Sequence, residues 1–137
     1  MTQLKWRYFI GWLPLVLIAI VNGALRQLLF QQSLGELHAH QLSTATGIAL
    51  FAAYIWWVIE RWNPASIAET VTIGALWVLL TIVFEFGMGR FILNREWSVL
   101  LHDYNILDGR VWVLVPIWVG VAPTLFFILR RNRFGAR

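Results

Sequence analysis

The residues that could do chemistry in this chain gather in short segments between long apolar runs. The segment GELHAHQLSTATG at 35–47 places Glu36, His38 and His40 at alternate positions just before an apolar stretch. Carboxylate and imidazole groups suit proton transfer or the binding of a metal ion. Because each helical residue turns by about 100°, His38 and His40 point about 200° apart. We therefore expect at most one of them to face the interior of a helix bundle.

A metal site is one interpretation of these groups. Neutral imidazole and carboxylate together are typical ligands of zinc, and the candidate ligands are His40, His102, Glu36 and Asp103. The pattern is not diagnostic, because these residues form no His-x-x-x-His or Glu-x-x-His pair. A solvated histidine is the simpler interpretation. Cysteine is absent, and so is the Gly-x-Ser-x-Gly pattern of a nucleophilic serine.

Glu85 is the acidic residue that the sequence places deepest in an apolar run. It shares a helical stripe with Gly74, Thr81 and Gly89, and small and polar residues of this kind pack helices closely. Counted from Thr70, Glu85 lies roughly 22 Å along a hydrocarbon core about 30 Å thick. An ionisable group there needs a partner, and it serves either in a buried ion pair that fixes helix packing or in a proton relay or ligand site.

Polar residues of the neighbouring runs are the expected partners of Glu85. Arg26 is the nearest expected counter-ion, with Arg90 and His40 behind it. Guanidinium groups also bind phosphate and carboxylate, so the outer arginines Arg26, Arg90, Arg95 and Arg110 could line an outward pocket for a lipid phosphate or a small anion. The candidate ligand-binding residues are Arg26, His40, Glu85, Arg90, Asn22 and Thr44.

The elements that must position these residues are membrane-spanning helices. Of the 137 residues, 59% are hydrophobic and 13% are charged, and no charge interrupts the runs 8–25, 41–59, 70–84 and 111–129. A helix needs about 20 mostly apolar residues to cross the hydrocarbon core, where the backbone must satisfy its own hydrogen bonds. We predict an all-α integral membrane bundle, a single domain over 1–137, with transmembrane helices at about 8–30, 34–62, 67–92 and 109–131. The first is expected to be a retained helix and not a cleaved signal.

Local signals predict where these helices begin and end. Asn63 and Pro64 end the second helix, and Ser66 with Glu69 forms a capping-box pattern that begins the third. Ser33 forms the same pattern with Glu36, which predicts a cap for the second helix. Asp108 is the expected cap of the fourth.

Two further segments could shape the outer end of the bundle. Between about 95 and 104, apolar residues follow the spacing of one helical face, which predicts a short interfacial helix. These residues are Trp97, Leu100, Leu101 and Tyr104. In the fourth helix, Pro116, Gly120 and Pro123 indicate a kinked stripe that could leave room for a cavity.

Charge asymmetry predicts the orientation. Seven of the 11 basic residues and two of the 7 acidic residues fall on the side of the termini and of the second connection. The other side carries four basic and five acidic residues. By the positive-inside rule, the chain is a multi-pass protein of the cell membrane, the inner membrane where a cell has two, with both termini in the cytoplasm. We therefore expect the basic residues behind the net charge of +4 to interact with anionic lipid head groups and not with nucleic acid.

Three functions are compatible with this pattern. The first is an outward-facing polar pocket that binds or transports a small anionic solute or a lipid head group. The second is a metal-dependent membrane enzyme that acts on lipid at the outer leaflet, with zinc activating water. The third is an accessory subunit of a membrane complex. A chain this short encloses little volume, so we expect membrane lipids and either further copies of itself or a partner membrane protein to contact it.

Overall fold

A computed structural model of the chain describes residues 5–102, 105, 107 and 112–135. No strand occurs in these ranges, and nearly all of their residues are helical. Four continuous helical stretches within them are long and apolar enough to cross a membrane, namely Trp6–Leu34, Glu36–Trp62, Ile67–Ile92 and Leu114–Gly135. The predicted fold class, a four-helix membrane bundle with a short helix before the fourth span, is confirmed.

The helical elements follow one another closely along the chain. The first span contains α1 (Trp6–Leu25), the π-helical segment η1 (Arg26–Phe30) and α2 (Gln31–Leu34). The second is α3 (Glu36–Trp62), and the third contains α4 (Ile67–Gly87) and a second π-helical segment, η2 (Met88–Ile92). The short helix α5 (Trp97–His102) precedes α6 (Leu114–Gly135).

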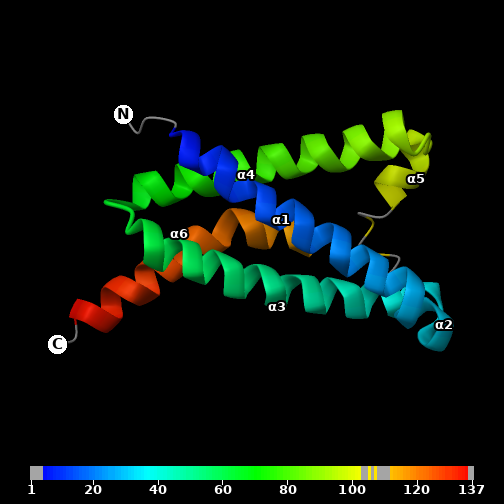
Figure 1. Cartoon of the computed structure of the whole chain (residues 1–137), viewed down its shortest axis with the longest axis horizontal. Coiled ribbons are helices and arrows are strands. Elements are labelled where there is room, and N and C mark those ends of the chain that lie inside the picture. Colours follow the sequence, from blue (N-terminus) through cyan, green and yellow to red (C-terminus); the bar gives the residue numbers. More distant parts are fainter. Residues whose placement is uncertain (1–4, 103–104, 106, 108–111, 136–137) are drawn as a thin grey trace.

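The spans form a ring in which α1 and α6 each contact both α3 and α4. Consecutive spans α3 and α4 are therefore diagonal partners. Figure 1 shows both termini and the link between α3 and α4 at one end of the bundle, here called the terminal end. Segments α2 and α5 lie at the other end, here called the far end, where α4 and α3 have diverged (Figure 1).

The link between α3 and α4 is short because each helix has a strong local stop or start. Asn63 ends α3 in a left-handed conformation with φ 48°, and its N–H donates to the carbonyl oxygen of Ile59 at 3.1 Å. Ser66 caps α4, and its hydroxyl oxygen accepts from the backbone N–H of Glu69 at 3.2 Å. The second-helix stop and the capping-box prediction at Ser66 are confirmed.

The start of α3 differs from the sequence prediction. Ser33 does not cap α3, because it lies inside α2, and the residue that precedes α3 is Gly35 with no side-chain cap. Gly35 has φ 80°, a conformation that glycine adopts without a steric penalty. This one residue turns the chain from the first span into the second, which leaves no loop in which a serine cap could form.

Large side chains close the core in the terminal half of the bundle. Trp77 is fully buried, and its indole nitrogen donates to the carbonyl oxygen of Tyr8 at 2.8 Å. The Trp62 ring contacts the rings of both Tyr8 and Trp77, with centroids 5.8 and 6.0 Å apart. Gly11 makes room for it, since a Cβ there would lie 2.4 Å from the Trp62 ring. This aromatic cluster seals the terminal half.

Contact between α4 and α6 depends on two glycines. A Cβ added at Gly74 would lie 2.2 Å from the carbonyl oxygen of Gly120, so the two backbones touch. Small residues allow this approach between helices in lipid. The stripe that we expected to leave room in the fourth helix is thus filled by α4 at Gly120, and α6 continues past Pro123 to Gly135.

The region before α6 is only partly described. Helix α5 lies within the predicted segment 95–104, and its Leu100 is buried against Gly89 of η2. The Trp97 ring stacks on Phe86 with centroids 6.2 Å apart. The face predicted to contact lipid therefore packs partly on the third span. Tyr104 and the predicted cap Asp108 lie outside the described residues.

Candidate functional site

A cavity of about 290 Å³ lies at the far end of the bundle. Its walls come from both π-helical segments, from α1, α3, α4 and α5, and from Trp112, which lies just before α6. Arg26, His40, Glu85 and Arg95 bring charged or titratable groups to the lining. Three of these four, Arg26, His40 and Glu85, are predicted ligand-binding residues, and the fold brings them together from three different spans.

Glu85 is held at the cavity by Trp112, which lies just before the fourth span. The indole nitrogen of Trp112 donates to a carboxylate oxygen of Glu85 at 3.0 Å. The Trp112 ring also meets the His40 ring edge to face, with centroids 5.9 Å apart and an interplanar angle of 62°. Trp112 thus contacts both titratable residues of the wall and links α3 to α4 at this end.

The two arginines of the wall come from irregular parts of the backbone. Arg26 is the first residue of η1, where the helix changes from α to π geometry. Arg95 follows Asn94, whose φ of 54° turns the chain, and its N–H donates to the carbonyl oxygen of Gly89 at 2.8 Å. Single π-turns are found frequently at functional sites, because they shift side chains out of the regular helical pattern. Here one lies on each side of the cavity.

Asn22 and Thr44 are buried but do not line the cavity. The side-chain amide of Asn22 donates to the carbonyl oxygen of Ser43 at 2.7 Å and to its hydroxyl at 2.9 Å, and it accepts from the Thr46 hydroxyl at 2.7 Å. The Thr44 hydroxyl donates to the carbonyl oxygen of His40 at 2.9 Å. Asn22 therefore joins α1 to α3, and Thr44 bonds within its own helix.

The remaining predicted site residues are spread over the far end. Arg90 lies in η2 but outside the cavity lining, and Glu36 and His102 are exposed in α3 and α5. Among the described residues, no group of three His, Asp or Glu side chains could hold a metal ion. Asp103 lies outside those residues, so the zinc site stays a prediction.

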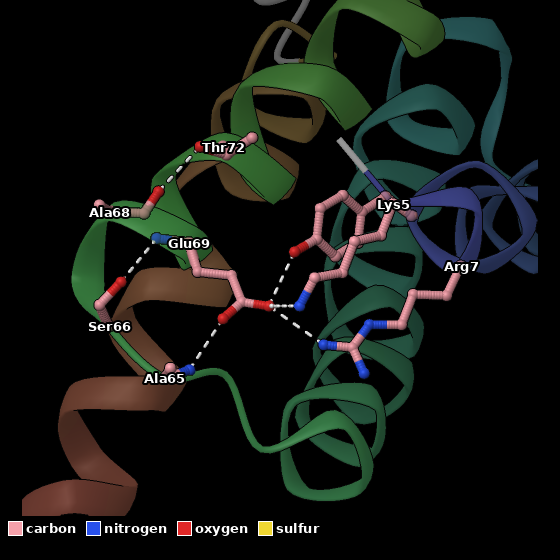
Figure 2. A network of polar contacts seen from close by, with 8 residues as sticks. Lys5, Arg7, Ala65, Ser66, Ala68, Glu69 and Thr72 are labelled. Carbon is pink, nitrogen blue, oxygen red and sulfur yellow. Dashed lines mark hydrogen bonds and ion pairs between the residues drawn. The ribbon is translucent and has the colours of Figure 1, made fainter. Parts of the chain in front are cut away.

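A second cluster of charged residues lies at the terminal end around Glu69 (Figure 2). One carboxylate oxygen accepts from the Tyr8 hydroxyl at 2.7 Å, from Arg7 at 3.1 Å and from Lys5 at 3.3 Å. The other accepts from the N–H of Ala65 at 2.8 Å. Both oxygens are occupied by the protein itself, so this cluster fastens α1 to the start of α4 and is structural.

The sequence did not predict that Trp112 and Tyr8 contribute to these clusters, and it placed Arg95 only among the arginines of the outer end. The positions of Arg95 and Trp112 at the cavity depend on the turn at Asn94 and on the hydrogen bond between Trp112 and Glu85. Tyr8 carried no signal beyond its position near the start of an apolar run.

Together, the fold and the site define a polytopic helical membrane protein with one mixed-charge cavity at the end opposite its termini. Comparison of the chain with protein-family models, with curated proteins and with solved structures finds no match.

Proposed function

We propose that this chain is an outward-facing binding protein of the cell membrane, whose far-end cavity holds a small anionic solute or an anionic lipid head group. The observation that carries the proposal is the convergence of Arg26 and Arg95, from two separate segments, with His40 and Glu85 on one cavity of about 290 Å³. That volume is near the lower limit of about 300 Å³ for small-molecule pockets. The cavity therefore suits one compact head group.

The charge of the wall favours an anion. Two guanidinium groups face one carboxylate, so the lining keeps a positive excess when His40 is neutral. Arginine binds phosphate and carboxylate through two parallel hydrogen bonds, which fixes the orientation of the ligand. Glu85 supplies an acceptor that Trp112 holds in place, and it can receive a hydrogen bond from a hydroxyl or ammonium group of the same ligand.

The distribution of basic residues supports a cavity that faces the outer side. Lys5, Arg7, Arg61, Arg130, Arg131 and Arg133 lie at the terminal end, where Glu60 and Glu69 are the acidic residues. Positive charge of this kind is retained on the cytoplasmic side of inner membranes. Both termini are then cytoplasmic, and the far end faces outward.

Binding from one side fits the sealed core better than continuous passage does. Tyr8, Trp62 and Trp77 close the terminal half beneath the cavity, and all three are held by ring contacts or hydrogen bonds. Transport of the ligand would require this aromatic cluster to open. The conformation described here is one that receives a ligand from the outer side.

The test compares anion binding by two matched arginine variants. Purified protein is titrated with inorganic phosphate and with phosphatidylglycerol in mixed micelles, and binding is measured by the rise in thermal unfolding temperature. Arg26→Gln removes a charged donor of the wall and should weaken binding by ~10-fold or more, since a hydrogen bond to a charged group contributes about 1.5–3 kcal/mol. Arg61→Gln, an exposed arginine at the terminal end, is the control and should bind normally. Equal binding by both variants would refute the proposal.

A further inference from the structure

We propose, building on the anion-binding function above, that the ligand is an anionic membrane amphiphile that enters the cavity sideways from the bilayer. Its charged head lies against Arg26 and Arg95, and its hydrocarbon chain lies along the deeper apolar residues Ala19, Ile20 and Phe84. The shared chemistry is a phosphate or carboxylate group, and the structure favours a lipid as its source over a soluble ion.

The lining of the cavity differs in polarity between its outer part and its deeper part. Arg26 marks its outer part, whereas Ala19 and Ile20 of the same span line its deeper part. Six residues separate Ile20 from Arg26, which corresponds to roughly 9 Å along a helix axis. On α4, Phe84 lines the cavity below Met88 and Gly89. The arginines therefore lie in the outer part of the wall, and the deeper part is apolar except for Glu85, which lies beside Phe84 on α4. This order matches the order of head group and chain in a lipid.

The opening of the cavity lies beside exposed residues of α1 and of the segment that follows the third span. Ile20 and Leu93 both line the cavity, and 54% and 57% of their surfaces are exposed. Ile20 belongs to α1 and Leu93 directly follows the third span, where the neighbouring medium is hydrocarbon or its boundary. The other exposed lining residues are Gln27 and Arg95, so the mouth has an apolar and a polar border. Such a mouth suits an amphiphile, whose chain and head group need different surroundings.

The first and third spans separate at the level of the cavity because they pack on different partners there. In the layer beneath the cavity, α1 and α4 are joined, because the Trp12 indole donates to the Thr81 hydroxyl at 3.1 Å and its ring meets Phe84. Above that layer the two spans have different partners: η1 packs on α3, and η2 packs on α5. Figure 1 shows α1 crossing from the side of α4 towards α3 along its length. The separation of α1 from η2 is therefore built into the fold.

A small inner cavity extends the apolar wall. It has a volume of about 40 Å³, and it shares Ala19, Phe84 and Glu85 with the main cavity. Its other walls include Leu15, Val16 and Phe51, all apolar. A hydrocarbon chain that lies along the wall below the arginines would point towards this space, whereas a compact soluble anion would not fill it.

Gly23 gives the proposal a precise test. It lines the main cavity, and a Cβ added there would meet no atom within 4 Å, so we expect a leucine at this position to occupy cavity space. Gly87 is the matched control, because it is also a helical glycine with nothing within 4 Å and does not line the cavity. Both substitutions replace a helical glycine by a good helix former.

The experiment measures binding of three probes to the wild type and to both glycine variants in zwitterionic nanodiscs or micelles, by native mass spectrometry with titration. The probes are phosphatidylglycerol, phosphatidylcholine with the same chains, and glycerol 3-phosphate as the soluble head group. We expect one phosphatidylglycerol per protein, bound ~10-fold or more tightly than either other probe. Gly23→Leu should reduce its affinity by ~10-fold or more, and Gly87→Leu should leave it unchanged.

Other outcomes separate this inference from the function on which it rests. If glycerol 3-phosphate binds as tightly as phosphatidylglycerol, the ligand is a soluble anion, so the amphiphile inference falls and the anion-binding function stands. Equal binding of phosphatidylcholine, or no binding of any probe, overturns both. Unchanged binding by a folded Gly23→Leu variant shows that the lipid binds elsewhere.

A second pair of variants covers the case in which Gly23→Leu does not fold. Ile20→Trp narrows the mouth, and Leu17→Trp, one turn away on the exposed face of the same helix and outside the lining, is its control. Loss of phosphatidylglycerol binding only in Ile20→Trp supports entry at this mouth. Equal binding by both variants contradicts it.

Discussion

The indole nitrogen of Trp112, two residues before α6, lies 3.0 Å from a carboxylate oxygen of Glu85 on α4 and donates a hydrogen bond to it. This contact holds the acid at the boundary between the main cavity and the small inner one, since Glu85 lines both. An ionisable residue in a membrane span is thus kept at a fixed position in the wall. Its carboxylate can then accept from a ligand without a large rearrangement.

Trp112→Phe tests the role of this hydrogen bond. The phenyl ring keeps an aromatic contact with His40, but Glu85 loses its donor and competes more strongly with a bound anion for the arginines. We expect affinity for phosphatidylglycerol to fall ~3- to 10-fold, with a loss of about 1–2 kcal/mol in stability. The control is Trp118→Phe, whose indole donates to the carbonyl oxygen of Ile48 at 3.1 Å and does not line the cavity. Equal losses of affinity in the two variants would contradict the assignment.

Gly74→Ala tests the contact between α4 and α6. The new Cβ would lie 2.2 Å from the carbonyl oxygen of Gly120, and backbone atoms cannot move aside as a flexible side chain can. Overpacking of this kind costs about 1–3 kcal/mol, so the unfolding temperature should fall markedly. The measurement is thermal unfolding in detergent followed by circular dichroism. Gly87→Ala is the comparison, because its Cβ meets no atom within 4 Å, and no decrease is expected there.

Glu69→Gln tests the cluster at the terminal end. The glutamine keeps the size of the side chain, but it removes the charge to which Lys5, Arg7 and Tyr8 donate hydrogen bonds. We expect a loss of about 1.5–3 kcal/mol in the free energy of unfolding, the value of a hydrogen bond to a charged group. Ligand binding should not change, because no residue of this cluster lines the cavity.

The matched comparison is Glu60→Gln. Glu60 bonds Arg133 at 2.8 Å and Arg130 at 3.3 Å, but 30% of its side chain is exposed, against 8% for Glu69. Exposed ion pairs contribute about 0–1 kcal/mol. A larger loss in Glu60→Gln than in Glu69→Gln, measured by denaturant unfolding, would show that burial does not decide the strength of these two clusters.

Single cysteines test the orientation, since the native chain has none. Gln32→Cys places a thiol at the exposed far end, and Asn132→Cys places one at the exposed terminal end. In intact cells, a membrane-impermeant maleimide should label Gln32→Cys and should reach Asn132→Cys only after lysis. The opposite pattern would place the cavity in the cytoplasm and would reverse the proposed side of binding.

The sequence was sufficient for the membrane fold because hydrocarbon imposes a strict rule on the chain. Each span has a long uncharged run, such as 70–84, and the predicted third helix, 67–92, covers the same residues as α4 and η2 together. The cap at Ser66 was readable for a similar reason, since its partner N–H lies only three residues away. The false cap at Ser33 arose because the pattern does not report that Gly35 turns the chain directly.

The site was only partly readable, because a helical stripe gives a direction and not a neighbour. Arg26, His40 and Glu85 were selected from their polarity and do line one cavity. Asn22 looked equivalent, but the adjacent Ser43 and Thr46 of α3 occupy its amide. Arg95 depends on the left-handed turn at Asn94, a conformation for which periodicity gives no signal.

The central claim is that the far-end cavity binds an anion of the membrane. Its most direct test is native mass spectrometry of the protein released gently from its own membranes, reading the mass in excess of the 15.9 kDa chain. We predict a discrete adduct with the mass of one anionic lipid on the wild type and on Gly87→Leu, and its loss from Gly23→Leu. Bare protein, an adduct that Gly23→Leu retains, or protein bound only to another polypeptide would contradict the account.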